Sequence, residues 1–174
     1  KNMEKLTALY HVADRHPWGD KLLAESAVKF YAVFDWQPML SEMRLIKSPN
    51  EIRLMQQAGQ ITAFGHIKAM QVTRPNRFEY EIESEILHEF NRHGARFPSY
   101  NSIVAGGDNA CILHYTENDQ PLKDGDLVLI DAGCEFAMYA GDITRTFPVN
   151  GKFTQPQREI YELVLKAQKR AIEL

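Results

Sequence analysis

Two aspartates interrupt consecutive apolar runs, LVLIDAG and YAGDITRTFPV, and they constrain the fold more than any other feature. The run that contains Asp131 is apolar on both faces of a strand, so its carboxylate is expected to be buried and to need a partner. If the two runs form an antiparallel hairpin centred on Phe136 and Ala137, Asp131 and Asp142 lie opposite each other. Like charges so placed repel, and a cation would relieve the repulsion.

The spacing alone leaves simpler roles open for both residues. Asp142 follows Gly141 and can be a turn or bulge residue, while Asp131 can accept backbone N–H groups at a strand end. Phe136 and Ala137 lack the turn chemistry of tight hairpins, which favours a longer or bulged connection. Converging carboxylates suit a two-metal site, with ions about 3.5–4 Å apart, but the spacing does not select it.

Composition is typical of a globular protein and excludes several classes of function. The chain of 174 residues is 44% hydrophobic, enough for one sizeable core. With 20 basic and 23 acidic residues it has no basic excess, so no nucleic-acid partner is expected. It has no apolar run long enough for a membrane span and no signal-peptide core, so no membrane partner and a cytoplasmic location are predicted. Cys111 and Cys134 are expected to be buried free thiols.

The order of the predicted elements indicates an α+β fold with an antiparallel sheet backed by helices. A boundary is expected at the stretch MRLIKSPNEI, which begins at Met43 and in which Ser48, Pro49 and Glu51 form a helix start. It divides the chain into residues 1–42 and 43–174. Before it, residues 19–34 are expected to be helical. After it, helices are expected over 49–72, over 78–93 and from Thr154 onward, and strands over 102–105, 110–114, 127–132 and 139–149.

Apolar spacing predicts which faces of the first two helices after the boundary are buried. In the first, the face runs from Ile52 and Met55 through Ala58 and Ile61 to Gly65. In the second, three apolar residues are expected in the core and four acidic residues in solvent rather than at a metal. The apolar set is Ile82, Ile86 and Phe90, and the acidic set is Glu81, Glu83, Glu85 and Glu89.

His114 is the histidine best placed for function. It ends the predicted strand 110–114 and leads into a polar turn, so it can face a cleft, although a lone strand histidine is more often structural. The remaining histidines are expected to be solvated, and these are His11, His16, His66, His88 and His93.

The segments HYTEN, LVLIDAGCE and GDITRTFPVNGKFT, in this order, closely resemble the bacterial aminopeptidase P (Xaa-Pro aminopeptidase) family of the creatinase and methionine aminopeptidase superfamily. The upstream HEFNRHGARFPSYNSIVAGGDNACIL continues the resemblance, which extends from about residue 43 to about residue 165. It implies a pita-bread fold, in which an antiparallel sheet backed by helices is built as two similar halves.

The resemblance also implies roles for three residues. Asp131 and Asp142 correspond to the two aspartate metal ligands, and His114 corresponds to the catalytic histidine that lines the substrate cleft. The expected cofactors are two divalent ions, most commonly Mn(II), and the expected reaction releases the amino-terminal residue of a peptide with proline second. Hard carboxylate ligands agree with such ions.

The chain lacks three of the metal ligands that the family pattern contains. The family has one further histidine ligand and two glutamate ligands in its second half, so this chain is expected to be an inactive fragment of a longer, homo-oligomeric enzyme. Two alternatives stay open, a prolidase that cleaves Xaa-Pro dipeptides and a non-catalytic pita-bread module that binds peptides. Retention of Asp131, Asp142 and His114 disfavours the module.

Overall fold

The computed structural model describes residues 8–12, 15–25 and 32–174, and it contains two compact units, Lys1–Ser48 and Pro49–Leu174. The division lies six residues beyond the one expected before Met43. The first unit contains β1 (Ala8–Tyr10), α1 (Pro17–Glu25), β2 (Ala32–Phe34) and α2 (Gln37–Leu45).

The prediction of a helix over residues 19–34 is wrong at its carboxyl end. Helix α1 ends at Glu25, and β2 pairs in parallel with β1. The run Ala-Val-Phe has high strand propensity, and pairing with a distant strand overrides its local helical spacing. Residues 26–31, which complete the predicted helix, lie outside the described residues.

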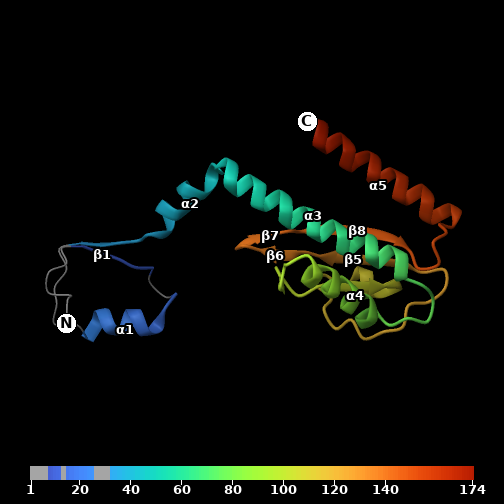
Figure 1. Ribbon diagram of the computed structural model, residues 1–174, viewed down its shortest axis with the longest axis horizontal. Helices are drawn as coiled ribbons and strands as arrows, with labels where there is room; N and C mark the ends of the chain where they lie inside the picture. The colour runs from blue at the N-terminus through green and yellow to red at the C-terminus, as the bar shows by residue number, and fades with distance from the viewer. Residues whose placement is uncertain (1–7, 13–14, 26–31) are drawn as a thin grey trace. The chain divides into compact units, whose positions relative to one another are not determined.

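The second unit holds two helices, a set of antiparallel strands and a final helix (Figure 1). Strands β4, β5 and β8 form one sheet with β5 in the centre, and β3, β6 and β7 form another. Every strand pair in this unit is antiparallel, which confirms the predicted α+β class. The elements are α3 (Pro49–Val72), α4 (Glu79–Arg92), β3 (Phe97–Pro98), β4 (Ile103–Gly106), η2 (Gly107–Cys111), β5 (Leu127–Ala132), β6 (Cys134–Phe136), β7 (Tyr139–Ala140), β8 (Ile143–Pro148) and α5 (Gln155–Glu173).

Local capping contacts and backbone conformation mark the helix boundaries. Helix α3 begins at Pro49, and α4 begins after Phe78, whose N–H donates to the Glu81 carboxylate at 2.7 Å. Gly94, with φ of +90°, follows the end of α4. Before α5, Thr154 and Gln157 exchange the two hydrogen bonds of a capping box. These boundaries were therefore set by local sequence.

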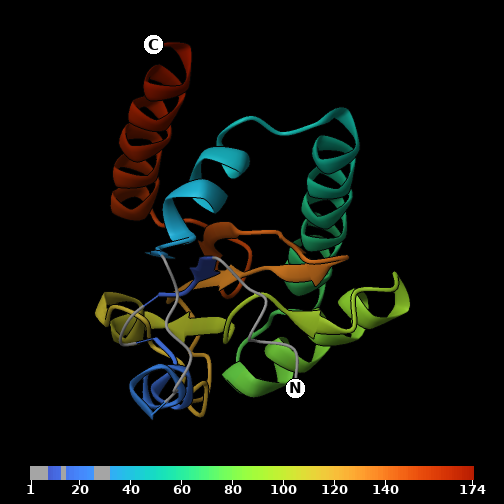
Figure 2. The same ribbon diagram turned by 90° about the vertical axis from the view of Figure 1, so that its left-hand side faces the viewer.

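The core lies between α3, α4 and one face of the central sheet. Alternate residues of β5 are fully buried there, and they are Val128, Ile130 and Ala132. The opposing helix residues are Ala58, Ile61, Ala69, Ile82, Ile86 and Phe90. The face predicted for α3 is wrong in its first turns, because Ile52 is 46% exposed and Met55 is 41% exposed. In Figures 1 and 2, α5 stands apart from α3 and α4, and none of its residues is buried.

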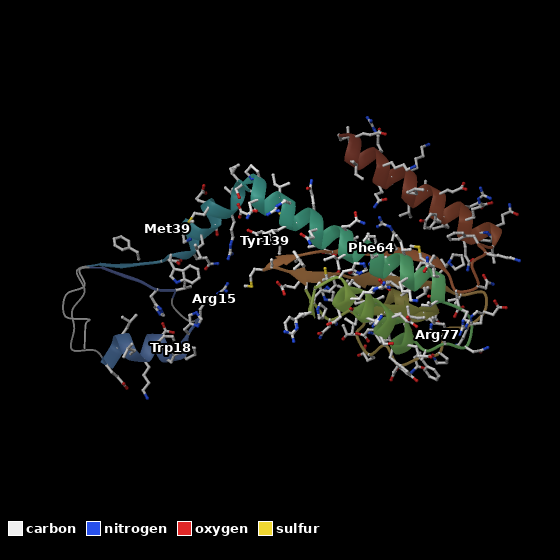
Figure 3. The ribbon with its side chains drawn as sticks, in the orientation of Figure 1. Arg15, Trp18, Met39, Phe64, Arg77 and Tyr139 are labelled. Atoms are coloured by element: carbon white, nitrogen blue, oxygen red, sulfur yellow. The ribbon has the colours of Figure 1, made fainter. Side chains whose placement is uncertain are left out.

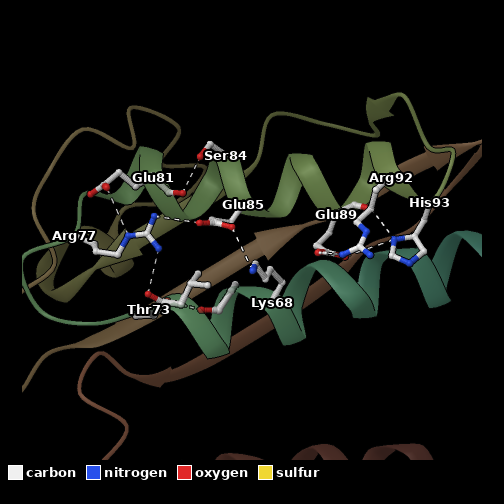
Figure 4. Close-up of polar contacts among 11 residues, drawn as sticks. Lys68, Thr73, Arg77, Glu81, Ser84, Glu85, Glu89, Arg92 and His93 are labelled. Carbon is white, nitrogen blue, oxygen red and sulfur yellow. Dashed lines mark hydrogen bonds and ion pairs between the residues drawn. The ribbon is translucent and has the colours of Figure 1, made fainter.

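The acidic face predicted for α4 is less solvated than expected (Figure 4). Glu85 is paired with Arg77 at 3.4 Å and with Lys68 at 3.6 Å. Glu89 is 7% exposed and accepts a hydrogen bond from Arg92 at 3.1 Å, so the prediction of solvent exposure is wrong for it. The basic partners come from α3 (Lys68), from the residues before α4 (Arg77) and from α4 itself (Arg92), and they compensate for the desolvation of these carboxylates.

The hairpin that follows β5 turns one residue later than predicted. Its two turn residues are Ala137 and Met138, with φ of 50° and 71°, as a two-residue turn of this type requires. Asp131 therefore pairs with Thr144 rather than with Asp142. At the tip of the hairpin, the Tyr139 hydroxyl donates to Glu51 at 2.8 Å, which ties the turn to the first turn of α3 (Figure 3).

Three further predictions are corrected by the structure. Residues 110–114 form the end of η2 and a turn rather than a strand, and Cys111 is exposed there, whereas Cys134 is buried as expected. His66 is 3% exposed instead of solvated.

Across the described residues, none of the helices combines the length and the hydropathy needed to span a bilayer.

Candidate metal site

Two glycines allow the backbones of the hairpin to approach closely beside Asp142. A Cβ atom on Gly133 would lie 1.8 Å from the carbonyl oxygen of Gly141. A Cβ atom on Gly141 would lie 2.1 Å from the Thr62 hydroxyl oxygen. Both contacts are far below van der Waals separation, so only glycine fits at either position. This glycine crossing, Gly133 and Gly141, brings Asp142 toward the strand that carries Asp131.

Neighbouring polar groups fix the crossing in place. Ser99 donates its N–H to the Gly133 carbonyl at 2.9 Å and its hydroxyl to the Gly141 carbonyl at 2.8 Å. From α3, the Thr62 hydroxyl accepts the N–H of Cys134 at 3.1 Å. Because these buried backbone groups are paired, the separation of the two strands is set by the backbone and not by exposed side chains.

The two aspartates converge on one hydroxyl group. Tyr100 Oη lies 2.5 Å from Asp131 Oδ1 and 3.0 Å from Asp142 Oδ1. The two carboxylate oxygens are therefore no further apart than 2.5 plus 3.0 Å, which is about 5.5 Å. The predicted convergence is confirmed, although the residues are diagonal neighbours on one face and not directly opposite. The expected burial of Asp131 is wrong, because only alternate residues of β5 are buried and Asp131 lies on the half-exposed face.

Tyr100 supplies the donor that the paired carboxylates need. Burial raises the pKa of its phenol far above the ordinary value, and the hydrogen bond to Asp131 raises it further. The group therefore stays protonated and places a partially positive hydrogen between two anionic oxygens. The point between the carboxylates thus favours positive charge.

The residues present fit part of a divalent-metal site. Asp131 and Asp142 offer hard oxygen ligands, which suit ions such as Mn(II) or Mg(II) in octahedral coordination by about six oxygens. Each carboxylate supplies at most two oxygens, so the pair cannot complete the coordination of two ions. Among the described residues, no group of three His, Cys, Asp or Glu side chains is placed to hold a metal. Further ligands must come from water, substrate or residues outside this set.

His114 is not brought into contact with the aspartates. It is exposed in a turn after η2, with a backbone φ of +56°. In the part of the chain that the structure describes, its imidazole forms no hydrogen bond to Asp131 or Asp142. The structure therefore presents His114 to solvent from a loop, while the aspartate pair, Asp131 and Asp142, lies at the sheet.

Sequence reasoning missed Tyr100, and little in the sequence could have revealed it. The residue lies between two short strands without apolar periodicity, and only the fold brings it beside residues 31 and 42 positions away. A mainly apolar groove of about 760 Å³ lies next to the site, between β8 and α5. Thr144, the partner of Asp131, lines this groove, but Tyr100, His114, Asp131 and Asp142 do not.

Comparison with known proteins agrees with the resemblance found in the sequence. Residues 53–174 match the sequence profile of metallopeptidase family M24. The chain is 86% identical over 174 residues to the Xaa-Pro aminopeptidase of Haemophilus influenzae and 53% identical over 180 residues to that of Escherichia coli. It spans 40% and 41% of the lengths of these two relatives.

Solved structures show the same likeness. Proline aminopeptidase P II from Yersinia pestis has a TM-score of 0.92 and 50% identity, covering 97% of this chain and 41% of that one. A variant of Escherichia coli aminopeptidase P in complex with substrate has a TM-score of 0.92 and 52% identity, covering 99% and 42%. The partial pita-bread architecture expected from the sequence is thereby confirmed. The chain belongs to metallopeptidase family M24.

Proposed function

We propose that this chain forms the first part of the active site of an Xaa-Pro aminopeptidase. Such an enzyme releases the amino-terminal residue from a peptide whose second residue is proline. In this proposal, Asp131 and Asp142 are two of the metal ligands, and His114 acts at the substrate. The activity belongs to the longer enzyme, because this chain spans about 40% of the length of its relatives.

The observation that carries the proposal is the convergence of Asp131 and Asp142 on the Tyr100 hydroxyl. A purely structural strand aspartate would need one donor and no second carboxylate beside it. The relatives named as Xaa-Pro aminopeptidases, at 86% and 53% identity, support this specific activity over other peptidase activities. An aminopeptidase P structure with bound substrate supports the same class of ligand.

Each residue of the site has a distinct role in the proposed reaction. Two divalent ions, when bound, would supply Lewis acidity and an activated water at neutral pH. Asp131 and Asp142 would hold them, and the Tyr100 hydroxyl would orient the Asp131 carboxylate. His114, exposed on its loop, would donate a proton or hydrogen bond to the oxygen of the scissile carbonyl as charge develops there.

Three finer points stay predictions. Manganese is supported by the hard oxygen ligands, although a zinc-substituted aminopeptidase P with bound product shows that a relative also accepts zinc. A cytoplasmic location, expected from the sequence composition, and a homo-oligomeric assembly of the longer enzyme, implied by the resemblance, are the other two. A prolidase would share the metal carboxylates, so peptide length distinguishes it from an aminopeptidase.

The test joins this chain to the carboxyl-terminal part of the Haemophilus influenzae relative, giving a hybrid enzyme that contains the remaining ligands. The hybrid enzyme is expected to release the first residue of a tripeptide or longer peptide with proline second, with stimulation by Mn(II). The 174-residue chain alone is expected to be inactive, because it holds two of the five expected ligands. Cleavage limited to Xaa-Pro dipeptides would favour the prolidase alternative.

Variants of the hybrid enzyme separate the roles of its residues. Asp142→Ala should abolish both metal-stimulated activity and tight metal binding. His114→Ala should lower kcat by about 10²- to 10⁴-fold with little change in bound metal. Asp124→Ala, which removes an exposed carboxylate in a turn, is the matched control and should leave both unchanged. Metal-dependent cleavage by the purified 174-residue chain, or by the Asp142→Ala hybrid, would overturn the proposal.

A further inference from the structure

The loop that carries His114 has little regular structure to hold it. It connects β4, which ends at Gly106, with β5, which begins at Leu127. It contains the short η2 and a single bridge, between Phe78 and Pro121. Isolated loops of this length are normally mobile, yet His114 occupies a defined left-handed conformation at its exposed tip. Something outside the loop must therefore restrain it.

One buried carboxylate contacts this loop at four points. Glu79, the first residue of α4, is 1% exposed. Its Oε1 accepts the Gly106 N–H at 2.8 Å and the Asn109 amide at 3.0 Å. Its Oε2 accepts the Tyr115 hydroxyl at 2.7 Å and the Gln120 N–H at 3.0 Å. The four donors are the last residue of β4, one residue of η2 and two loop residues on either side of residues 116–119.

The chemistry of this contact requires a carboxylate. Both oxygens accept two hydrogen bonds each, which a charged carboxylate does and a neutral amide cannot. Burial of a charge is costly, and here four donors and the amino terminus of α4 compensate for it. The pKa of Tyr115 is raised to about 12 by burial and then by its bond to Glu79, so the hydroxyl remains a donor at neutral pH.

We infer that Glu79 is a positioning residue for His114, because its carboxylate holds the neighbouring Tyr115, the last residue of β4 and Gln120 on the far side of the imidazole. The inference rests on the proposed function of His114 for its catalytic meaning. Glu79 acts through the loop and does not itself contact Asp131 or Asp142. A second anchor on the same helix, Glu83, reaches the loop only through Asn118, at 3.0 Å.

The first test uses NMR spectroscopy of the isotopically labelled 174-residue chain and requires no catalytic activity. Glu79→Gln keeps the size of the side chain but replaces one acceptor oxygen with a donor. The expected results are at least a tenfold loss of amide-exchange protection within residues 107–120 and a shift of the His114 ¹³Cα and Hα signals away from left-handed values. The amides of α3 and β5 should keep their protection. Glu85→Gln, on the same helix, is the matched control, because its carboxylate pairs with Arg77 and Lys68 and not with the loop, and it should leave the His114 signals in place.

Tyr115→Phe provides a milder variant in case Glu79→Gln fails to fold. It removes the Tyr115 bond to Glu79 and the Asn109 bond to the same hydroxyl, keeps the other three bonds of Glu79, and should move the same signals by a smaller amount. Unchanged His114 signals in a folded variant would overturn the inference, as would a loss of protection that is uniform across the second unit.

The second test asks whether Glu79 acts through His114. In the hybrid enzyme, Glu79→Gln should lower kcat about tenfold with unchanged bound metal, and it should cause no further loss once His114 is alanine. Full additivity of the two substitutions would contradict a positioning role. An inactive hybrid enzyme would contradict the proposed function while leaving the NMR result to decide the role of Glu79.

Discussion

The aspartate pair, Asp131 and Asp142, and the loop that carries His114 are held in place in different ways, although both belong to one candidate site. Asp131 and Asp142 are placed by the glycine crossing, where the Gly133 and Gly141 backbones meet and the buried hydroxyl of Thr62 and that of Ser99 hold them. His114 is placed by an exposed loop that side chains of α4 restrain from outside. The comparison indicates that the spacing of the carboxylates is rigid and that the position of His114 is adjustable. Under the proposed function, such a loop would adapt to substrate while the two aspartates stay fixed.

The largest expected effect comes from filling the glycine crossing. Gly133→Ala places a Cβ atom 1.8 Å from a backbone oxygen, which cannot move without separating the strands. We expect a loss of about 3 kcal/mol or more in the free energy of unfolding, measured by urea denaturation. The matched control is Gly59→Ala in α3, where nothing lies within 4 Å of the new Cβ atom. It should stabilise the chain by up to about 1 kcal/mol. Equal effects of the two substitutions would refute the rigid crossing.

An intermediate effect is expected where the loop meets the sheet. Asn118 is 2% exposed, and its side chain accepts the N–H of Val104 at 2.9 Å and donates to the Ser102 carbonyl at 2.9 Å. It thereby satisfies the free edge of β4. Asn118→Ala leaves these buried groups unpaired and should cost about 1–3 kcal/mol, measured in the same way. Asn101→Ala, at an exposed position nearby, is the control, and a similar loss there would remove the argument for a specific anchor.

A smaller effect, dependent on pH, is expected behind the sheet. Burial lowers the pKa of His66 below 6.5, with Arg145 lowering it and Asp131 raising it, while its ring donates to the Ala132 carbonyl at 3.1 Å. The unfolded chain therefore binds a proton at His66 before the folded chain does. Its contribution to stability is complete above about pH 6.5 and decreases as the pH falls toward the folded pKa. The urea midpoint should drop more between about pH 7.5 and pH 5.5 in the natural chain than in His66→Gln. A steeper drop in His66→Gln would show that the sign is wrong.

The smallest effect is expected at His114 itself. The residue is exposed and its imidazole has no hydrogen bond to Asp131 or Asp142. His114→Ala should therefore change the free energy of unfolding by less than about 0.5 kcal/mol. Its backbone already adopts φ of +56° without glycine, and alanine meets the same restriction. A loss comparable to that of Asn118→Ala would mean that His114 is a structural residue of the loop.

Local signals in the sequence were sufficient for most of the helices and strands. Pro49, Gly94 and Thr154 mark helix boundaries through backbone geometry and capping, which are properties of neighbouring residues. The strand 127–132 was predicted with the bounds observed, because its apolar run is continuous. The predicted position of the hairpin turn was wrong by one residue, because Ala137 and Met138 adopt positive φ without the usual glycine or asparagine.

Local sequence signals could not predict the polar contacts of the site. Tyr100 and Glu79 contact residues that are 27 to 42 positions away in sequence, so no spacing rule could pair them. Residues 110–114 are apolar enough for a strand, yet Leu113 is 85% exposed in a turn. The resemblance to a known family identified Asp131, Asp142 and His114, but only the fold shows that two of them converge while the third lies on a separate loop.

The most direct test of the central claim is a titration of the 174-residue chain with Mn(II), followed by paramagnetic broadening of its NMR signals. If Asp131 and Asp142 form a shared metal site, the amide signals of these residues and of Tyr100 should broaden first. The broadening should be lost in Asp142→Asn and retained in Asp124→Asn. Binding is expected to be weak, because two carboxylates leave most coordination positions to water. Broadening that centres instead on the glutamates of α4, or that persists unchanged in Asp142→Asn, would contradict the account.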